Sequence, residues 1–124
     1  MDKKFGRGTM IEKWIRDIKA TCAPDQLGMI LVHNGIVRGT AKDGKSVQGM
    51  VLSYDEGLLE QTLDKFRNME GIVAVRAWIN KGELQIGDDI MYVLVAGRFR
   101  TDVLPVFQDL IRTIKSEIVK EEER

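Results

Sequence analysis

Apolar and polar residues alternate along the chain with two different periods, which separate the predicted helices from the predicted strands. Residues 9–20 ("TMIEKWIRDIKA") carry apolar side chains at helical spacing, and Thr9 with Glu12 forms a capping box that predicts a helix start at Thr9. A second capping box, Ser53 with Glu56, predicts another helix, whose apolar face contains Leu58, Leu59, Leu63 and Phe66.

The last segment, 101–124, predicts a third helix that runs to the end of the chain. Thr101 or Asp102 is its predicted cap, and Pro105 is expected in its first turn, where proline is tolerated. Its charged end, "KEEER", is expected to be frayed and solvated. The apolar residues form one continuous stripe: Val103, Phe107, Leu110, Ile111, Ile114 and Ile118.

Four apolar, β-branched segments predict strands, at 29–39, 47–54, 71–80 and 89–98. Asn34-Gly35 indicates a bulge in the first strand, and residues 40–46 ("TAKDGKS") indicate a turn before the second. The order is helix, two strands, helix, two or more strands, helix. It predicts an α+β fold with a mostly antiparallel sheet, and no repeat or linker divides the single domain expected over residues 1–124.

Composition narrows the possible partners. Nineteen basic residues balance nineteen acidic ones, so no net charge favours nucleic acid or an anionic membrane, and no partner of either kind is predicted. No apolar run is long enough to span a membrane, and the N-terminus lacks a signal-peptide core. With a single cysteine, Cys22, the chain has no internal disulfide framework. We therefore expect a cytoplasmic protein.

Few residues suggest chemistry by themselves. His33 lies mid-strand without metal-ligand spacing and is interpreted as structural, and Cys22 as an incidental thiol. No donors converge on a metal site, so we predict no metal and no resident cofactor. The glycines at 35, 39 and 44 form no phosphate loop, because the segment leads into a strand.

Two cations remain open to two interpretations each. Arg38 ends the first predicted strand, where a pocket built by loops would begin, although the residues alone favour an ordinary surface arginine at this position. Lys115 lies beside the apolar stripe, roughly 85° from its centre on a helix of about 100° per residue. Its stem can be buried while the ammonium stays hydrated, or the ammonium can stand at the mouth of a pocket.

The motifs, taken in order, resemble the large, catalytic subunit of molybdopterin synthase over roughly residues 10 to 122. "GIVRG" (35–39) is similar to the family's G-x-V-R segment, and Tyr54-Asp55 to its strand end. "NKGELQIGDD" (80–89) is similar to its G-x-L-x-x-G-[DE] connection. The resemblance implies a fold of the α/β-hammerhead type and a homodimer joined through its sheets.

The resemblance also implies a reaction. A small ubiquitin-like sulfur carrier would insert its C-terminal Gly-Gly thiocarboxylate beside cyclic pyranopterin monophosphate, and two sulfur transfers would build the dithiolene of molybdopterin. Val37 with Arg38 and Phe99 with Arg100 fall on the family's substrate-binding positions, where the arginines would hold the phosphate. Lys115 matches the first functional lysine, with a pKa lowered by those cations, and Lys120 is the candidate for the second.

The chain departs from the family pattern at several of these positions. Phe99 stands where the family has a histidine, and Ile79-Asn80 replaces a His-Arg pair. The family's P-x-W-K signature is replaced by "EIVKEE", so Lys120 matches only across a gap. On an unbroken helix the five positions from Lys115 to Lys120 turn the side chain by about 140°, and the two would share a pocket only if the helix ended near Ile118.

These departures keep two alternative hypotheses open. The first is a catalytically impaired homologue that serves as a dimeric binding module for a ubiquitin-like carrier. The second is a small-anion sensor or assembly protein that uses no carrier.

Overall fold

The computed structural model describes residues 2–124 of the chain, with side chains described from Met10 onward. The first half contains α1 (Asp2–Thr21), β1 (Met29–Ile36), β2 (Gly49–Tyr54) and α2 (Glu56–Arg67). The second half contains β3 (Ile72–Ile79), β4 (Gly82–Gln85), β5 (Asp89–Gly97), α3 (Arg100–Thr113), the π-helical turn η1 (Ile114–Ile118) and β6 (Val119–Glu123).

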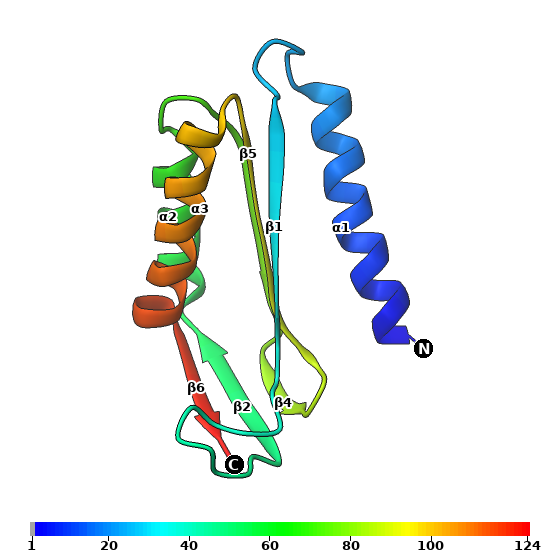
Figure 1. Ribbon diagram of the computed structural model, residues 1–124, viewed down its shortest axis with the longest axis vertical. Helices are drawn as coiled ribbons and strands as arrows, with labels where there is room; N and C mark the ends of the chain where they lie inside the picture. Colours follow the sequence, from blue (N-terminus) through cyan, green and yellow to red (C-terminus); the bar gives the residue numbers. More distant parts are fainter. Residues whose placement is uncertain (1) are drawn as a thin grey trace.

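The strands form two three-stranded sheets in which every pairing is antiparallel. The larger sheet has the order β1-β5-β3, and the smaller has the order β4-β2-β6. Figure 1 shows α1 on one side of the larger sheet and the pair α2 and α3 on the other. The smaller sheet continues below α2 and α3, so the C-terminal strand β6 lies beside β2 at the lower end of the molecule.

The central strand β5 is buried on both faces, which explains its continuous apolar run. Met91, Val93 and Val95 belong to the main core, which also contains the inner faces of α2 and α3. Leu94 and Ala96 point the other way and join a smaller core. The smaller core is closed by side chains of α1, among them Trp14, Ile15 and Ile18.

The predicted α+β class with antiparallel pairing is confirmed, and the helix starts are where the prediction was wrong. α1 already begins at Asp2, so Thr9 lies inside the helix and does not cap it. α2 is capped by Asp55, whose Oδ1 accepts a hydrogen bond of 3.0 Å from the Leu58 amide, and not by Ser53. Asp is as effective an N-cap residue as Ser, and Asp55 stands directly before the first residue of α2.

The caps proposed for the third helix are also corrected. α3 begins at Arg100 after Phe99, which makes no side-chain cap. The Asp102 carboxylate instead accepts a hydrogen bond of 3.2 Å from Arg98 Nε. Pro105 lies inside α3, beyond the first turn in which we expected it.

The C-terminal segment is the largest difference from the prediction. The helix ends through η1 at Ile118, and residues 119–123 form β6 where the sequence predicted a frayed helical tail. In β6, Glu121 pairs with Leu52 and Lys120 pairs with Ser53. β4 was missed as a strand, and the β1 irregularity falls between Gly35 and Ile36, one position after the predicted bulge.

Candidate active site around Lys115

Lys115 lies in the π-helical turn that ends the third helix. Ile114 and Ile118 are the first and last residues of this turn and are both buried in the main core, while the Val119 amide donates to the Ile114 carbonyl. The Lys115 side chain is 48% exposed. Because single π-helical turns occur often at functional sites, this local geometry makes Lys115 the first residue to inspect.

The carboxylate of Glu121 holds the Lys115 ammonium. Glu121 Oε2 lies 3.2 Å from Lys115 Nζ, and the Glu121 side chain is only 24% exposed. Directly opposed residues of an antiparallel pair share a face, so Glu121 lies on the same face as Leu52, which is buried in the main core. The Oε2 atom is buried, and no donor among the described residues makes a hydrogen bond of good geometry to it, so its contact with Lys115 is an ion pair.

A cavity of about 460 Å³ opens beside this pair. It is lined by Ala41, Lys42, Asp43, Lys115, Glu121 and Glu123. The first three belong to the predicted turn, whose ends are joined by a bridge between Thr40 and Ser46. Within the turn the Ala41 amide donates to the Lys45 carbonyl over 2.9 Å, and Gly44 has φ +88°, a conformation that favours glycine. The turn is therefore a formed wall of the cavity.

The charge of this cavity differs from the expectation. Three carboxylates and two ammonium groups line it, so its lining is net negative. The charged partner of Lys115 is a carboxylate, where the sequence predicted two neighbouring arginines. A cation-lined hollow for a phosphate is therefore not formed at this position by one chain.

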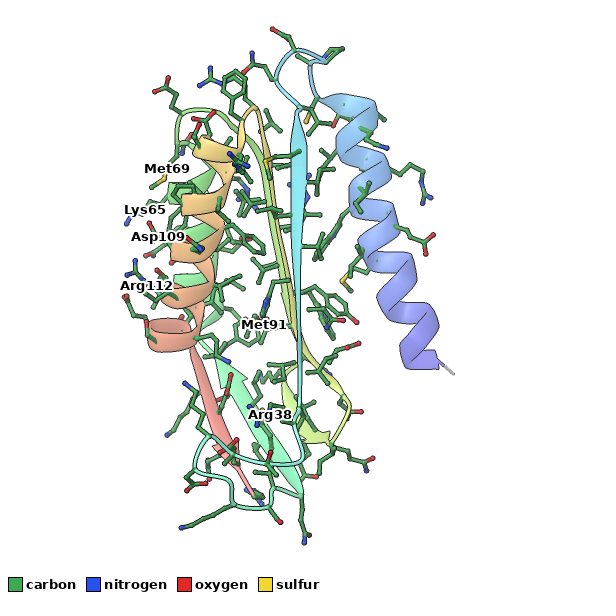
Figure 2. The ribbon with its side chains drawn as sticks, in the orientation of Figure 1. Arg38, Lys65, Met69, Met91, Asp109 and Arg112 are labelled. Atoms are coloured by element: carbon green, nitrogen blue, oxygen red, sulfur yellow. The ribbon has the colours of Figure 1, made fainter. Side chains whose placement is uncertain are left out.

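Arg38 lies at the start of the turn that forms the cavity wall. Its side chain is exposed, and Nη2 donates a hydrogen bond of 3.2 Å to Thr40 Oγ1. Figure 2 shows Arg38 at the lower end of β1, whereas Asp109 and Arg112 lie on the outward side of α3. Val37, by contrast, is buried in the main core, and its amide donates to the Asp88 carbonyl. Val37 thus supports the chain at Arg38, and its side chain is not available to a ligand.

His33 is a site residue that the sequence analysis missed. It lies on β1 two positions after Leu31, so by strand alternation both side chains face α3. Burial and, secondarily, the positive charge of Lys115 lower the pKa of His33 below its ordinary value of 6.5. The imidazole is therefore neutral at neutral pH. The alternation of side chains along the strand indicates which face of the sheet His33 lies on, but only the fold reveals that Lys115 lies near it.

Lys120 is separated from Lys115 although the helix ends near Ile118, which the sequence analysis gave as a necessary condition for a shared pocket. Successive side chains of a strand point to opposite faces, and Lys120 pairs with Ser53 on the face that turns away from Glu121. The prediction that the two lysines share one pocket is therefore wrong for a single chain.

Phe99 and Arg100 lie at the opposite end of α3 from Lys115. The fifteen positions from Arg100 to Lys115 correspond to roughly 20 Å along a helix. Phe99 is 58% exposed, and its ring centroid lies 4.9 Å from the Arg98 guanidinium. The predicted gathering of Arg38, Arg100 and Lys115 is therefore not present within one chain.

Comparison with known proteins identifies the family. A model of the family described as MoaE protein matches residues 10–117. The chain belongs to this family. The MoaE-family match thus includes Lys115 and ends at Glu117, one residue before the end of η1.

Solved structures agree with this MoaE-family assignment in fold. Molybdopterin synthase from Staphylococcus aureus superposes with a TM-score of 0.71 at 22% identity, over 89% of this chain and 82% of that one. A complex of subunits 1 and 2 of molybdopterin-converting factor from Helicobacter pylori gives a TM-score of 0.72 at 19% identity, over 93% and 75% of the two chains. An uncharacterized protein of Methanocaldococcus jannaschii is 28% identical over 94 residues, which cover 73% of this chain and 79% of that protein.

Membership of the MoaE family supports a role in molybdenum cofactor biosynthesis. Over the described residues 2–124, no helix combines the length and the apolarity that crossing a membrane requires.

Proposed function

We propose that this MoaE-family protein is a molybdopterin synthase catalytic subunit. It takes sulfur from the C-terminal thiocarboxylate of a small ubiquitin-like carrier and transfers it to cyclic pyranopterin monophosphate, forming the dithiolene. The observation that carries the proposal is the position of Lys115, within the family match, on a π-helical turn at a cavity of about 460 Å³. That volume can take the last residues of an extended peptide.

The partner is a small carrier protein with a flexible Gly-Gly terminus. The Helicobacter pylori structure to which this chain is similar contains both subunits of its molybdopterin-converting factor. Only the narrow tail of such a carrier would enter the cavity, because a volume of about 460 Å³ lined by residues such as Lys42, Asp43 and Glu123 has no room for a folded domain. Glycine is suited to this tail, since its backbone can pass close to the walls.

Lys115 and His33 supply the chemistry in this proposal. The thiocarboxylate sulfur first bonds to the pterin, so that carrier and pterin are joined as a thioester. When water attacks the carbonyl carbon of this thioester, negative charge develops on the carbonyl oxygen, and the C–S bond then breaks to leave the sulfur on the pterin. The Lys115 ammonium stabilises that charge, and the neutral imidazole of His33 accepts the proton that water releases. The carrier then ends in an ordinary carboxylate.

The phosphate of the substrate is assigned to arginines in the same proposal. Arg38, exposed beside the cavity turn, would hold it by charge-assisted hydrogen bonds. Arg100 would reach this site only from a second copy of the chain, because it lies at the far end of its own α3. The proposal therefore includes a homodimer in which Phe99 and Arg100 of one copy approach Lys115 of the other.

A turnover assay tests this proposal. The purified protein is mixed with thiocarboxylated carrier and cyclic pyranopterin monophosphate, and the dithiolene product is measured. Lys115→Ala should lower the rate by about 10²- to 10⁴-fold, the usual contribution of such a group. Lys65→Ala, on the exposed side of α2, is the matched control and should keep the parent rate. Absence of product, while a known large subunit is active beside it, would overturn the proposal.

The binding module is the second candidate, favoured by Phe99 in place of histidine and by the loss of the P-x-W-K signature. It predicts no turnover in the parent protein. It also predicts calorimetric binding of the carrier that persists in Lys115→Ala. The two measurements together separate the enzyme from the binding module.

A further inference from the structure

Glu121, the ion-pair partner of Lys115, occupies a strand position where a charged side chain is unusual. Glu121 stands on the core side of β6, opposite Leu52, where an apolar side chain would pack without any desolvation cost. Its Oε2 is buried and lacks a hydrogen bond from the described residues, so the Lys115 ammonium at 3.2 Å is what compensates its charge. Replacing such a pair by apolar residues is often neutral or favourable for stability, so fold stability gives little reason for it.

The pair fixes the end of a side chain that is otherwise mobile. A lysine at the surface has four rotatable bonds, and its ammonium samples many positions. Here the buried residues Ile114 and Ile118 fix the backbone of the π-helical turn, and Glu121 fixes the ammonium. These two anchors come from adjacent segments, η1 and β6, and both border the cavity.

We propose that Glu121 is a positioning residue for Lys115, holding its ammonium against the cavity wall. This rests on the proposed function, within which Lys115 acts as a fixed cation toward the carbonyl of the carrier tail and not as a nucleophile. An ammonium held in an ion pair must break that pair before it can lose a proton and attack carbon. Glu121 thereby decides which of the two roles Lys115 has.

The reactivity of Lys115 tests this without any sulfur transfer. The folded protein is treated with a trace of acetylating reagent, and the rate at each lysine is measured by mass spectrometry. Glu121→Gln should raise the rate at Lys115 by about three- to tenfold, since it removes the opposite charge that favours the ammonium. Glu122→Gln, on the opposite face of β6, is the matched control and should leave the rate at Lys115 unchanged. Lys65 serves as the internal reference.

Equal rates at Lys115 in the parent and in Glu121→Gln would overturn the proposal. If Glu121→Gln fails to fold, the acetylation rates of Lys115 and Lys65 in the parent protein test the proposal instead. Its Lys115 should then react several-fold more slowly than Lys65 in the native state and equally fast in denaturant. Equal native rates would overturn the proposal as well.

Turnover gives a second readout once the parent is shown to be active. Glu121→Gln should lower kcat about tenfold or more while the KM for the carrier stays within about twofold, because the effect is on the reacting group and not on docking. A rise in KM with unchanged kcat would contradict it. If the parent has no turnover, the proposed function fails, while the reactivity of Lys115 still decides whether Glu121 positions it.

Discussion

The protonation of His33, on β1, responds to the charge of Lys115. The imidazole faces α3, and both its burial and the nearby ammonium disfavour the charged form. Burial is the larger cause. His33 is also the only histidine of the chain, so its protonation can be followed without ambiguity.

We expect the NMR signal of the His33 ring to titrate below pH 6.5 in the native protein. Lys115→Met should raise this pKa but leave it below 6.5, because the burial remains. Below about pH 6.5 the unfolded chain binds a proton that the native chain does not, so this residue lowers stability as the pH falls from about 6.5 toward its native pKa. Lys65→Met is the control. An unchanged His33 pKa in Lys115→Met would contradict the placement of His33 beside Lys115, and a native pKa of 6.5 or higher would contradict its burial.

Sequence analysis found Lys115 but not its two neighbours. Lys115 was singled out by its position beside the apolar stripe, which is local information. His33 lies on β1, about eighty residues before Lys115 in the sequence. Glu121 lies on β6, which follows a change of direction in the chain after η1. Only the fold brings these two residues to Lys115. Glu121 was also hidden in a run of charges that resembles a solvated tail. The functional meaning of these side chains therefore depends on tertiary contacts.

Among the elements, η1 and β6 carry the two residues of the candidate site, Lys115 and Glu121. Residues 119–123 contain good helix formers, lysine and glutamate, directly after an apolar helix. Pairing with β2 overrides that propensity, and the Arg124 amide extends the pairing by donating to the Gly49 carbonyl over 2.9 Å. The predicted strands and α2 could be recognised from their own periodicity. The strand β6 could not, because it forms by pairing with β2, more than sixty residues earlier in the sequence.

Hydrogen exchange tests this element directly. Amides of residues 119–123 that donate to β2 should exchange at least about tenfold more slowly than in an unstructured peptide, because a paired strand must open before exchange. The amides at 42 and 43, in the cavity turn, are the comparison and should exchange faster. Exchange of the whole β6 segment at the unstructured rate would show that the tail is frayed, and it would remove Glu121 from the cavity wall.

At the scale of the whole molecule, the two ends of α3 separate two groups of candidate site residues. Arg38, Lys115 and Glu121 belong to the lower end, where the smaller sheet meets the turn 40–46. Arg100 and Phe99 belong to the upper end. One chain thus builds half of the expected phosphate site, which is why the proposed function includes a second copy.

The fold class followed from the sequence because it depends on local periodicity and on the order of the elements. The spatial gathering of cations did not follow, because the sequence gives no measure of which end of a helix meets which sheet. The structure replaces three converging cations by one lysine held by one carboxylate, with an arginine at the start of the adjoining turn.

The central claim is that the cavity beside Lys115 receives the Gly-Gly tail of a carrier. NMR titration of the isotopically labelled protein with such a carrier tests it most directly, with a carrier shortened by its last two residues as the control. The account predicts that the largest changes fall on residues 38–43, Lys115 and Glu121, and that the shortened carrier loses them. Saturating carrier that leaves these residues unchanged, or perturbs only the α1 side of the molecule, would contradict it.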